Sequence, residues 1–232
     1  MAYPFSSQQS FLSTLIGDSN TDSSSMWPLA QRKLELNHAE KQFARDTKIL
    51  MENATGTVAS MELAVPSGWI ETFCFYITVG SVKYRIDNDR EVSVKDLERW
   101  TDYAGDIPYY YFWGFSGTRK IKLLGVASGI NGGTYDLYYF EEPTTDLSDD
   151  ADVSLFPESY RQAPVFKAAS NLLIQIGQNT RAGQMLQQYD RLVSQARDEA
   201  RKWYLDYDQP RPDFNLIDPQ HTDRQGGGWD SQ

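Results

Sequence analysis

The chain has 232 residues, a formal net charge of −10 and one cysteine, Cys74. This length suits one large domain, or one domain that carries an inserted module. The negative charge argues against a protein that binds nucleic acid through its phosphates, because such binding needs clustered Lys and Arg. A single cysteine excludes an internal disulfide and a thiolate metal cage.

The N-terminal residues 1–25 are rich in Ser, Gln, Asn and Thr. This composition predicts a flexible N-terminal arm. The few apolar residues between positions 11 and 16 are too short a run to span a membrane, and no basic segment precedes them as in a signal peptide. We therefore expect neither a leader nor a membrane partner.

A helical period follows the arm, over residues 26–56. Leu29, Leu36, Phe43 and Leu50 recur at every seventh position, and Gly56 is expected to end the helix. The apolar stripe is narrow, so we expect this helix to pack against other helices.

Residues 57–152 differ in character from the flanking segments. Runs rich in β-branched and aromatic residues are separated by turns that contain Gly or Pro. This pattern predicts an inserted antiparallel β module of about five to seven strands, resembling a sandwich or a barrel. A short helix is predicted within it, over residues 93–100, where apolar residues recur at a spacing of three.

The strand 109–113, with the sequence YYYFW, does not alternate apolar with polar residues as a strand with one wet face would. One alternate set, Tyr110 and Phe112 together with Phe115 just beyond the strand, is expected to pack in the module's core. The other set, Tyr109, Tyr111 and Trp113, then faces a second layer or another subunit. The sequence alone leaves open which of the two sets points inward.

Residues 153–207 return to the helical period and complete a helical domain with residues 26–56. Pro164 lies inside the first helical pattern and is expected to kink or break it. The following helix ends before Pro210. The polar composition of residues 208–232 predicts a flexible C-terminal arm with a few apolar residues. The expected fold is α+β: a helical bundle of three amphipathic helices, an inserted β module and flexible termini.

Few residues in the sequence suggest catalysis. His38 lies in a helix and His221 in the polar tail, and neither accompanies a nucleophile elbow. Alternate acidic residues between Asp146 and Asp152 resemble a calcium loop, but the required glycine and the final glutamate are missing, which favours a solvated acidic linker. We expect no catalytic residue, metal or cofactor.

Two other classes of function remain open at this point. A β module with exposed aromatic rings, among them Tyr138 and Tyr139, could bind carbohydrate or a receptor by stacking. A hydrolase could use a carboxylate pair, either Glu141 with Glu142 or residues 149 and 150. Adjacent residues of a strand point to opposite faces, which argues against the first pair.

The segment VSLFPESYRQAPVFKAASNLLIQIGQNTRAGQMLQQYDRLVSQARDEAR resembles the C-terminal signature of head-to-tail adaptor (connector) proteins of tailed bacteriophages. In that signature an LP-x-x-Y motif opens a helix of small residues, a break with Asn or Asp follows, and a second helix ends in Arg-rich turns. The matching residues are Leu155, Pro157, Tyr160, Ala163, Ala168, Ala169, Leu172, Leu173, Gly177, Asn179, Ala182, Tyr189 and Arg197. Phe156 stands between the Leu and the Pro. The β module is similar as well, and the resemblance covers roughly residues 30–205.

This resemblance implies a structural virion protein rather than an enzyme. Adaptors of this kind form a ring, commonly of about twelve copies, beneath the portal, and tail or nozzle proteins attach to it. DNA passes through the channel without specific binding. The implied location is the neck of the virion, after assembly in the host cytoplasm.

A ring subunit presents two different faces to its neighbours, so it needs more apolar surface than a monomer. We predict subunit contacts at Tyr109, Tyr111, Trp113 and Tyr138. Apolar residues near the C-terminus are predicted to contact the portal: Trp203, Tyr207, Phe214, Leu216 and Ile217. Acidic side chains along a channel would repel DNA phosphates and let them slide.

Overall fold

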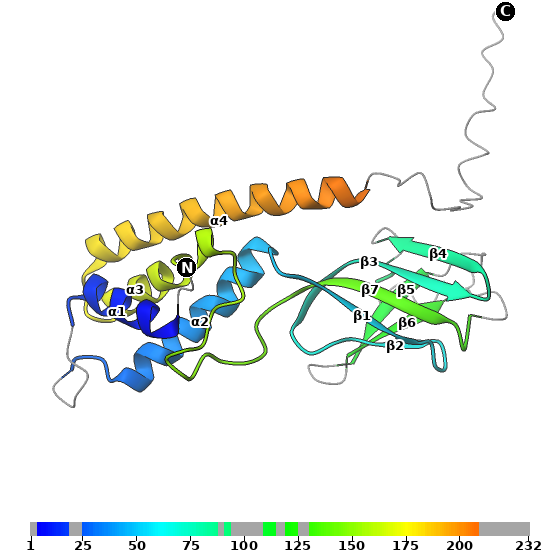
Figure 1. The fold of residues 1–232 in the computed structure, drawn as a ribbon, viewed down its shortest axis with the longest axis horizontal. Coiled ribbons are helices and arrows are strands. Elements are labelled where there is room, and N and C mark those ends of the chain that lie inside the picture. Colours follow the sequence, from blue (N-terminus) through cyan, green and yellow to red (C-terminus); the bar gives the residue numbers. More distant parts are fainter. Residues whose placement is uncertain are drawn as a thin grey trace, which may run out of the picture.

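The computed structural model describes residues 4–18, 25–87, 91–93, 109–114, 119–124 and 130–208, with side chains except those of Asp87 and residues 203–208. Within these residues, a helical bundle lies at one end of the molecule and a β-sandwich at the other (Figure 1). The sandwich is inserted between the second and third helices, so the predicted α+β class is confirmed. The predicted helix at 93–100 lies outside the described residues, except for Ser93.

The described residues form four α-helices rather than the predicted three. They are α1 (Phe5–Ile16), α2 (Leu29–Thr47), α3 (Ala163–Gln175) and α4 (Asn179–Asp208). Helix α1 lies in the segment predicted as an arm. Its residues Phe5, Leu12 and Ile16 are buried against α2 and α3, so the prediction of a flexible arm is wrong over residues 5–16.

The first predicted helix ends earlier than expected. Lys48 takes a left-handed conformation (φ 52°), and its backbone N–H donates to the carbonyl oxygen of Ala44 at 2.8 Å. The chain then continues at once as strand β1 (Met51–Thr57). The sequence MENATGT is polar because β1 is an edge strand, and this polarity hid it from the sequence analysis.

Helix α3 begins without the predicted kink. A single 3₁₀ turn over Glu158–Tyr160 precedes it, and Pro164 lies in the first turn of α3. Proline is tolerated there because its missing N–H would have no partner within the helix. The helical pattern is thus interrupted just before Pro164 and leaves a short first segment, which agrees with the predicted break and not with a kink inside α3.

The inserted module is a sandwich of two antiparallel sheets. One has the strand order β1-β7-β3-β4 and the other β2-β6-β5. The remaining strands are β2 (Glu62–Ala64), β3 (Trp69–Val79), β4 (Val82–Asp87), β5 (Tyr109–Trp113), β6 (Lys120–Leu124) and β7 (Thr134–Glu141). Phe75, Tyr110, Ile121 and Leu137 fill the space between the sheets and are fully buried.

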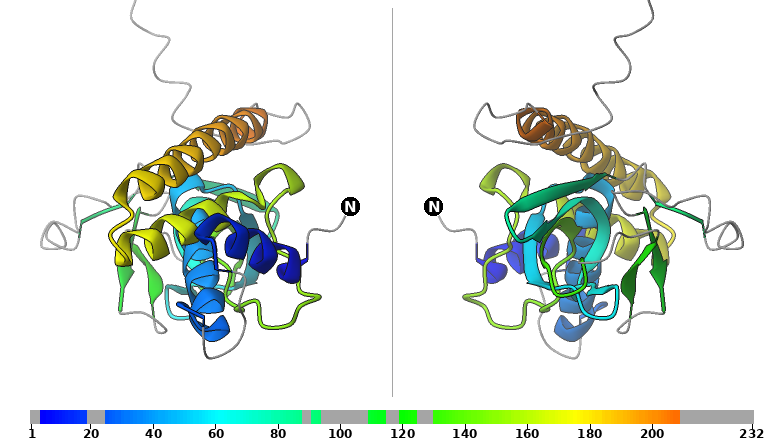
Figure 2. Two further views of the ribbon diagram at one scale, coloured as in Figure 1. Left: turned by 90° about the vertical axis from the view of Figure 1, so that its left-hand side faces the viewer. Right: turned by 90° about the vertical axis from the view of Figure 1, so that its right-hand side faces the viewer.

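Helix α4 packs along one side of the bundle and extends toward the sandwich (Figures 1 and 2). Its buried side chains Tyr189, Val193 and Ala196 meet Phe43 of α2 and Phe156. The Phe43 ring lies edge-on to that of Phe156, with centroids 4.9 Å apart. These contacts fix the direction in which the end of α4 points.

The acidic exit from the sandwich is exposed to solvent, as predicted, and it also makes contacts with α2. The side-chain amide of Asn37 donates to Leu147 O at 3.0 Å and accepts from Leu147 N–H at 2.8 Å. Lys41 forms an ion pair with Asp146 at 2.7 Å. The Asp152 carboxylate accepts two backbone N–H groups at 2.8 and 2.9 Å, which lowers its pKa. These acids therefore have structural partners.

A carboxylate is buried between α1, α2 and this exit segment. Glu40 is buried and accepts a hydrogen bond from the Gln8 amide at 3.3 Å. Burial raises the pKa of Glu40, while hydrogen bonds from Ser154 and Gln8 and the charge of Arg161 act in the opposite direction. The ionised form is therefore less favourable in the folded chain than in the unfolded chain.

We expect Glu40→Gln to raise the stability of the folded chain at pH 8 by about 1 kcal/mol and to change it little near pH 4. The folded pKa is raised, so the wild-type contribution is fully present below the unfolded pKa and is lost as the pH rises through the folded pKa. Thermal melts of both proteins from pH 4 to pH 8 measure this. Glu62→Gln is the control and should lower the stability at pH 8, because Lys120 and Lys122 lower the pKa of Glu62 and so favour its ionised form. A Glu40→Gln protein less stable than wild type at pH 8 would contradict the prediction.

Candidate interaction surfaces

The outer face of the sheet β2-β6-β5 carries a row of aromatic side chains. Tyr110 points into the sandwich and is fully buried, so the alternate residues of β5 point outward. Trp113 is 52 % exposed, and its ring lies edge-on to that of Tyr111, with centroids 6.5 Å apart. Tyr109, Tyr111 and Trp113 form what we call the aromatic strip, and the choice that the sequence left open is settled.

Charged side chains of β2 and β6 border the aromatic strip. Lys122 lies over the Trp113 ring, 5.4 Å from its centroid. Glu62 forms ion pairs with Lys120 and, at 3.1 Å, with Lys122. The strip is therefore an apolar row with a polar rim, the composition found in protein interfaces.

The outer face of the other sheet carries a second aromatic group. Tyr76 of β3 and Tyr138 of β7 lie edge to face, with centroids 6.0 Å apart. Lys83 lies 4.5 Å above the Tyr76 ring and pairs with Asp136 at 3.2 Å. We call Tyr76, Lys83, Asp136 and Tyr138 the tyrosine face. Tyr139, a candidate for sugar stacking, points inward and is buried.

The aromatic strip and the tyrosine face lie on opposite outer sides of the sandwich, since each belongs to the outer surface of a different sheet. The four predicted contact residues are thus not brought together into one patch. They are divided between two surfaces of different composition.

The predicted portal contacts lie beyond these surfaces. Trp203 and Tyr207 are in the last turns of α4, where the structure describes the helix but not the side chains. Phe214, Leu216 and Ile217 lie outside the described residues. The prediction for these five residues therefore stays a prediction.

A groove that the sequence analysis missed runs between the C-terminal half of α4 and the near end of the sandwich. We call it the basic groove and define it by Arg45, Lys48, Arg197 and Arg201 with the rings of Phe73 and Phe140. Its volume is about 470 Å³. The spacing of Arg197 and Arg201 by one helical turn was the available sequence signal.

A comparison of the whole chain with known protein families gives one decisive finding. The family model described as SU10 adaptor protein matches residues 10–211. The chain belongs to this family. No curated protein matches it.

Membership confirms the resemblance to phage head-to-tail adaptors. The match includes both helical segments and the sandwich, so the adaptor family accounts for the inserted arrangement as a whole. The family is one of structural phage proteins, and it implies a place in the virion neck and contacts with portal and tail proteins.

The residues that the sequence analysis considered for catalysis lie in different elements of the adaptor. His38 is exposed on α2, and Cys74 is buried in the sandwich. Glu141 and Glu142 have different neighbours: Glu52 and burial raise the pKa of Glu141, whereas Glu142 pairs with Arg45 at 2.5 Å. Among the described residues, no group of three or more His, Cys, Asp or Glu side chains is placed to hold a metal ion.

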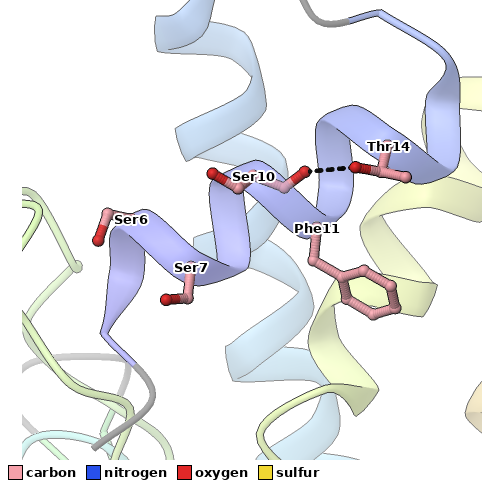
Figure 3. Close-up of a pocket in the computed structure, with 5 residues that line it drawn as sticks. All are labelled: Ser6, Ser7, Ser10, Phe11 and Thr14. Carbon is pink, nitrogen blue, oxygen red and sulfur yellow. Dashed lines mark hydrogen bonds between the residues drawn. The ribbon is translucent and has the colours of Figure 1, made fainter.

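A shallow hollow on α1 of the adaptor is lined by Ser6, Ser7, Ser10, Phe11 and Thr14 (Figure 3). The Thr14 hydroxyl donates a hydrogen bond to the carbonyl oxygen of Ser10 at 3.0 Å, so its proton is used within the helix. The hollow has no charged lining, and we assign it no ligand. None of the described helices combines the length and the apolar character needed to cross a membrane.

Proposed function

We propose that this adaptor forms a ring of about twelve copies beneath the portal, extends the DNA channel and provides the platform to which tail or nozzle proteins attach. The observation that carries the proposal is the presence of aromatic side chains on both outer faces of the sandwich in a chain of the adaptor family. In a single copy Trp113 is exposed and the tyrosine rings of both groups are partly exposed.

The subunit contact joins the aromatic strip of one copy to the tyrosine face of the next. In a ring of about twelve copies, successive subunits turn by about 30°, so the two contact surfaces of one copy point in nearly opposite directions. The two outer faces of a sandwich meet this requirement. Trp113 and Tyr138 are the residues on which the contact depends most, because aromatic side chains supply most of the energy at such interfaces.

The C-terminal segment after α4 docks on the portal through Phe214, Leu216 and Ile217, with Trp203 and Tyr207 at the base of the contact. We expect replacement of the three apolar residues of the segment by Ser to weaken binding to the isolated portal ring by at least ~100-fold, because each buried apolar side chain contributes about 1.5–3 kcal/mol. Binding of labelled adaptor to immobilised portal measures this effect.

Replacement of Trp229 by Ser is the matched control, since it removes a larger apolar side chain from the same polar tail. We expect the control to bind the portal as the wild type does. Equal affinities for the wild type and the triple variant would overturn the assignment of the docking segment while leaving the subunit contact untested by this assay.

The net charge of −10 supports passage of DNA without adhesion, because acidic walls repel phosphates. The alternative of a carbohydrate-binding module would use the same exposed ring of Trp113. Titration of tryptophan fluorescence with oligosaccharides separates the two functions, and we expect no quenching at millimolar sugar.

A further inference from the structure

The charge of the basic groove differs in sign from that of the chain. Four cations line it, and the acids that line it with them are Asp46 and Glu71. The chain as a whole has a net charge of −10. The lining has two more cations than acids, one of the cations, Arg45, being paired with Glu142 outside the lining. Together with the apolar rings of Phe73 and Phe140, this charge suits a ligand that is both acidic and apolar.

The acids of the groove are already engaged. Asp46 accepts the Tyr189 hydroxyl at 2.6 Å and the Gln42 amide at 2.8 Å, and Glu71 pairs with Lys48. Burial and the hydrogen bond to Asp46 raise the pKa of the Tyr189 hydroxyl, which therefore stays a donor. The two acids that line the groove therefore already have other partners, and the adjoining hollow, which Arg197 and Arg201 also line, contains Asp190 and Asp198.

Arg201 is the cation that remains available. Arg197 donates from Nε to the carbonyl oxygen of Asp46 at 2.5 Å, and Arg45 pairs with Glu142. Arg201 is exposed and lines both the basic groove and the hollow beside it, and it makes no hydrogen bond or ion pair within the part of the chain that the structure describes. A carboxylate at this position would gain a partner without displacing another.

The chain contains a segment of matching chemistry close to this point. In the sequence DFNLID, Asp213 and Asp218 flank the apolar residues Phe214, Leu216 and Ile217. Pro210 and Pro212 are incompatible with continuation of α4, so the chain is free to change direction after Asp208. The segment and the groove have opposite charges and both have apolar surface.

The segment is also long enough to reach the groove within one copy. Arg201 lies about seven residues before the end of α4, which is a distance of about 10 Å along the helix. The five steps from Asp208 to Asp213 span up to about 17 Å when extended. A chain that reverses after α4 therefore brings Asp213 and Phe214 level with Arg201.

From these observations we infer that, in the free adaptor, residues 213–218 fold back into the basic groove of the same copy, with a carboxylate of the segment on Arg201 and its apolar side chains against Phe73 and Phe140. The groove is thus a resting site for the segment. The inference concerns the isolated subunit and holds whether or not the same segment later docks on the portal.

Hydrogen exchange of the full-length adaptor, measured by mass spectrometry without portal, tests the inference. We expect the amides of residues 213–218 to exchange at least ~10-fold more slowly than those of residues 222–228. Arg201→Glu should bring the two rates together. Lys202→Glu is the matched control: it makes the same charge change at the next, exposed position, which does not line the groove, and should leave the protection intact.

Equal exchange of the two tail segments in the wild type would overturn the inference. So would protection that disappears on dilution, because this would place the segment in the groove of another copy. Protection that survives Arg201→Glu would also exclude the assigned carboxylate contact. A failure of portal docking cannot produce any of these results, since no portal is present.

Discussion

Replacement of Arg32 by Ala is expected to lower the free energy of unfolding by about 3–5 kcal/mol, the loss typical when one partner of a buried charged network is removed. Arg32 is buried on α2, with 1 % of its surface exposed. Its guanidinium donates to Trp27 O at 2.8 Å, Ser13 Oγ at 2.7 Å and Asp18 O at 3.1 Å. It also lies 3.5 Å from the Asp18 carboxylate.

These acceptors belong to the end of α1 and to the segment that enters α2, so Arg32 joins the two helices across their connection. Without the guanidinium, Asp18 keeps hydrogen bonds from Ser25 and the Trp27 N–H but loses its cation, and the Trp27 carbonyl oxygen loses a charged donor. Urea unfolding followed by tryptophan fluorescence measures the loss as a shift in the midpoint.

Arg45→Ala is the control for this experiment. Arg45 lies on the same helix and pairs with Glu142, but its side chain is 55 % exposed, and such a pair contributes at most about 1 kcal/mol. Arg32→Lys should recover part of the loss, because Lys keeps the charge and lacks the planar fork. If the Arg32→Ala and Arg45→Ala proteins unfold at the same urea concentration, the network has no special role.

A second large effect is expected at the proposed subunit contact. Trp113→Glu and Tyr138→Glu should each abolish ring formation on the portal, because a carboxylate placed in an apolar contact must lose its hydration without gaining a partner. The isolated subunits should stay folded, since Trp113 is half-exposed and Tyr138 lies on an outer face. Mass photometry of portal mixed with each variant counts the bound copies.

The two variants mixed in equal amounts give a sharper result. In a head-to-tail contact, the intact tyrosine face of the Trp113→Glu copy can bind the intact aromatic strip of the Tyr138→Glu copy. Cross-linking of the mixture on the portal should therefore stop at pairs, whereas each variant alone gives single copies. Met26→Glu, at an exposed apolar position shortly before α2 and outside the sandwich, is the control and should form complete rings. Complete rings from either contact variant would contradict the proposed contact.

The sequence predicted the inserted architecture because it depends on long periodic segments. The apolar faces of α3 and α4 and the turns of the sandwich can all be recognised from local patterns. Side chains of a strand point alternately to its two faces, so only two sets of β5 residues could point outward. Only the packing of Tyr110 against Phe75, with centroids 5.1 Å apart, decides between them.

The features that the sequence did not predict depend on contacts between distant residues. The sequence of α1 resembles a polar segment because Gln8 and Gln9 occupy buried positions. The Gln8 amide donates a hydrogen bond to Glu40 of α2, which no local pattern indicates. Strand β1 reads as a loop because its order comes from pairing with β7. The basic groove combines α4 with residues that are far away in the chain, so no local pattern contains it.

Electron cryo-microscopy of the adaptor assembled on its portal tests the central proposal most directly. The proposal predicts a closed ring in which Trp113 of each copy packs against the tyrosine face of the neighbouring copy. A reconstruction in which the sandwiches stand apart, with the aromatic strip facing solvent or a tail protein, would contradict it.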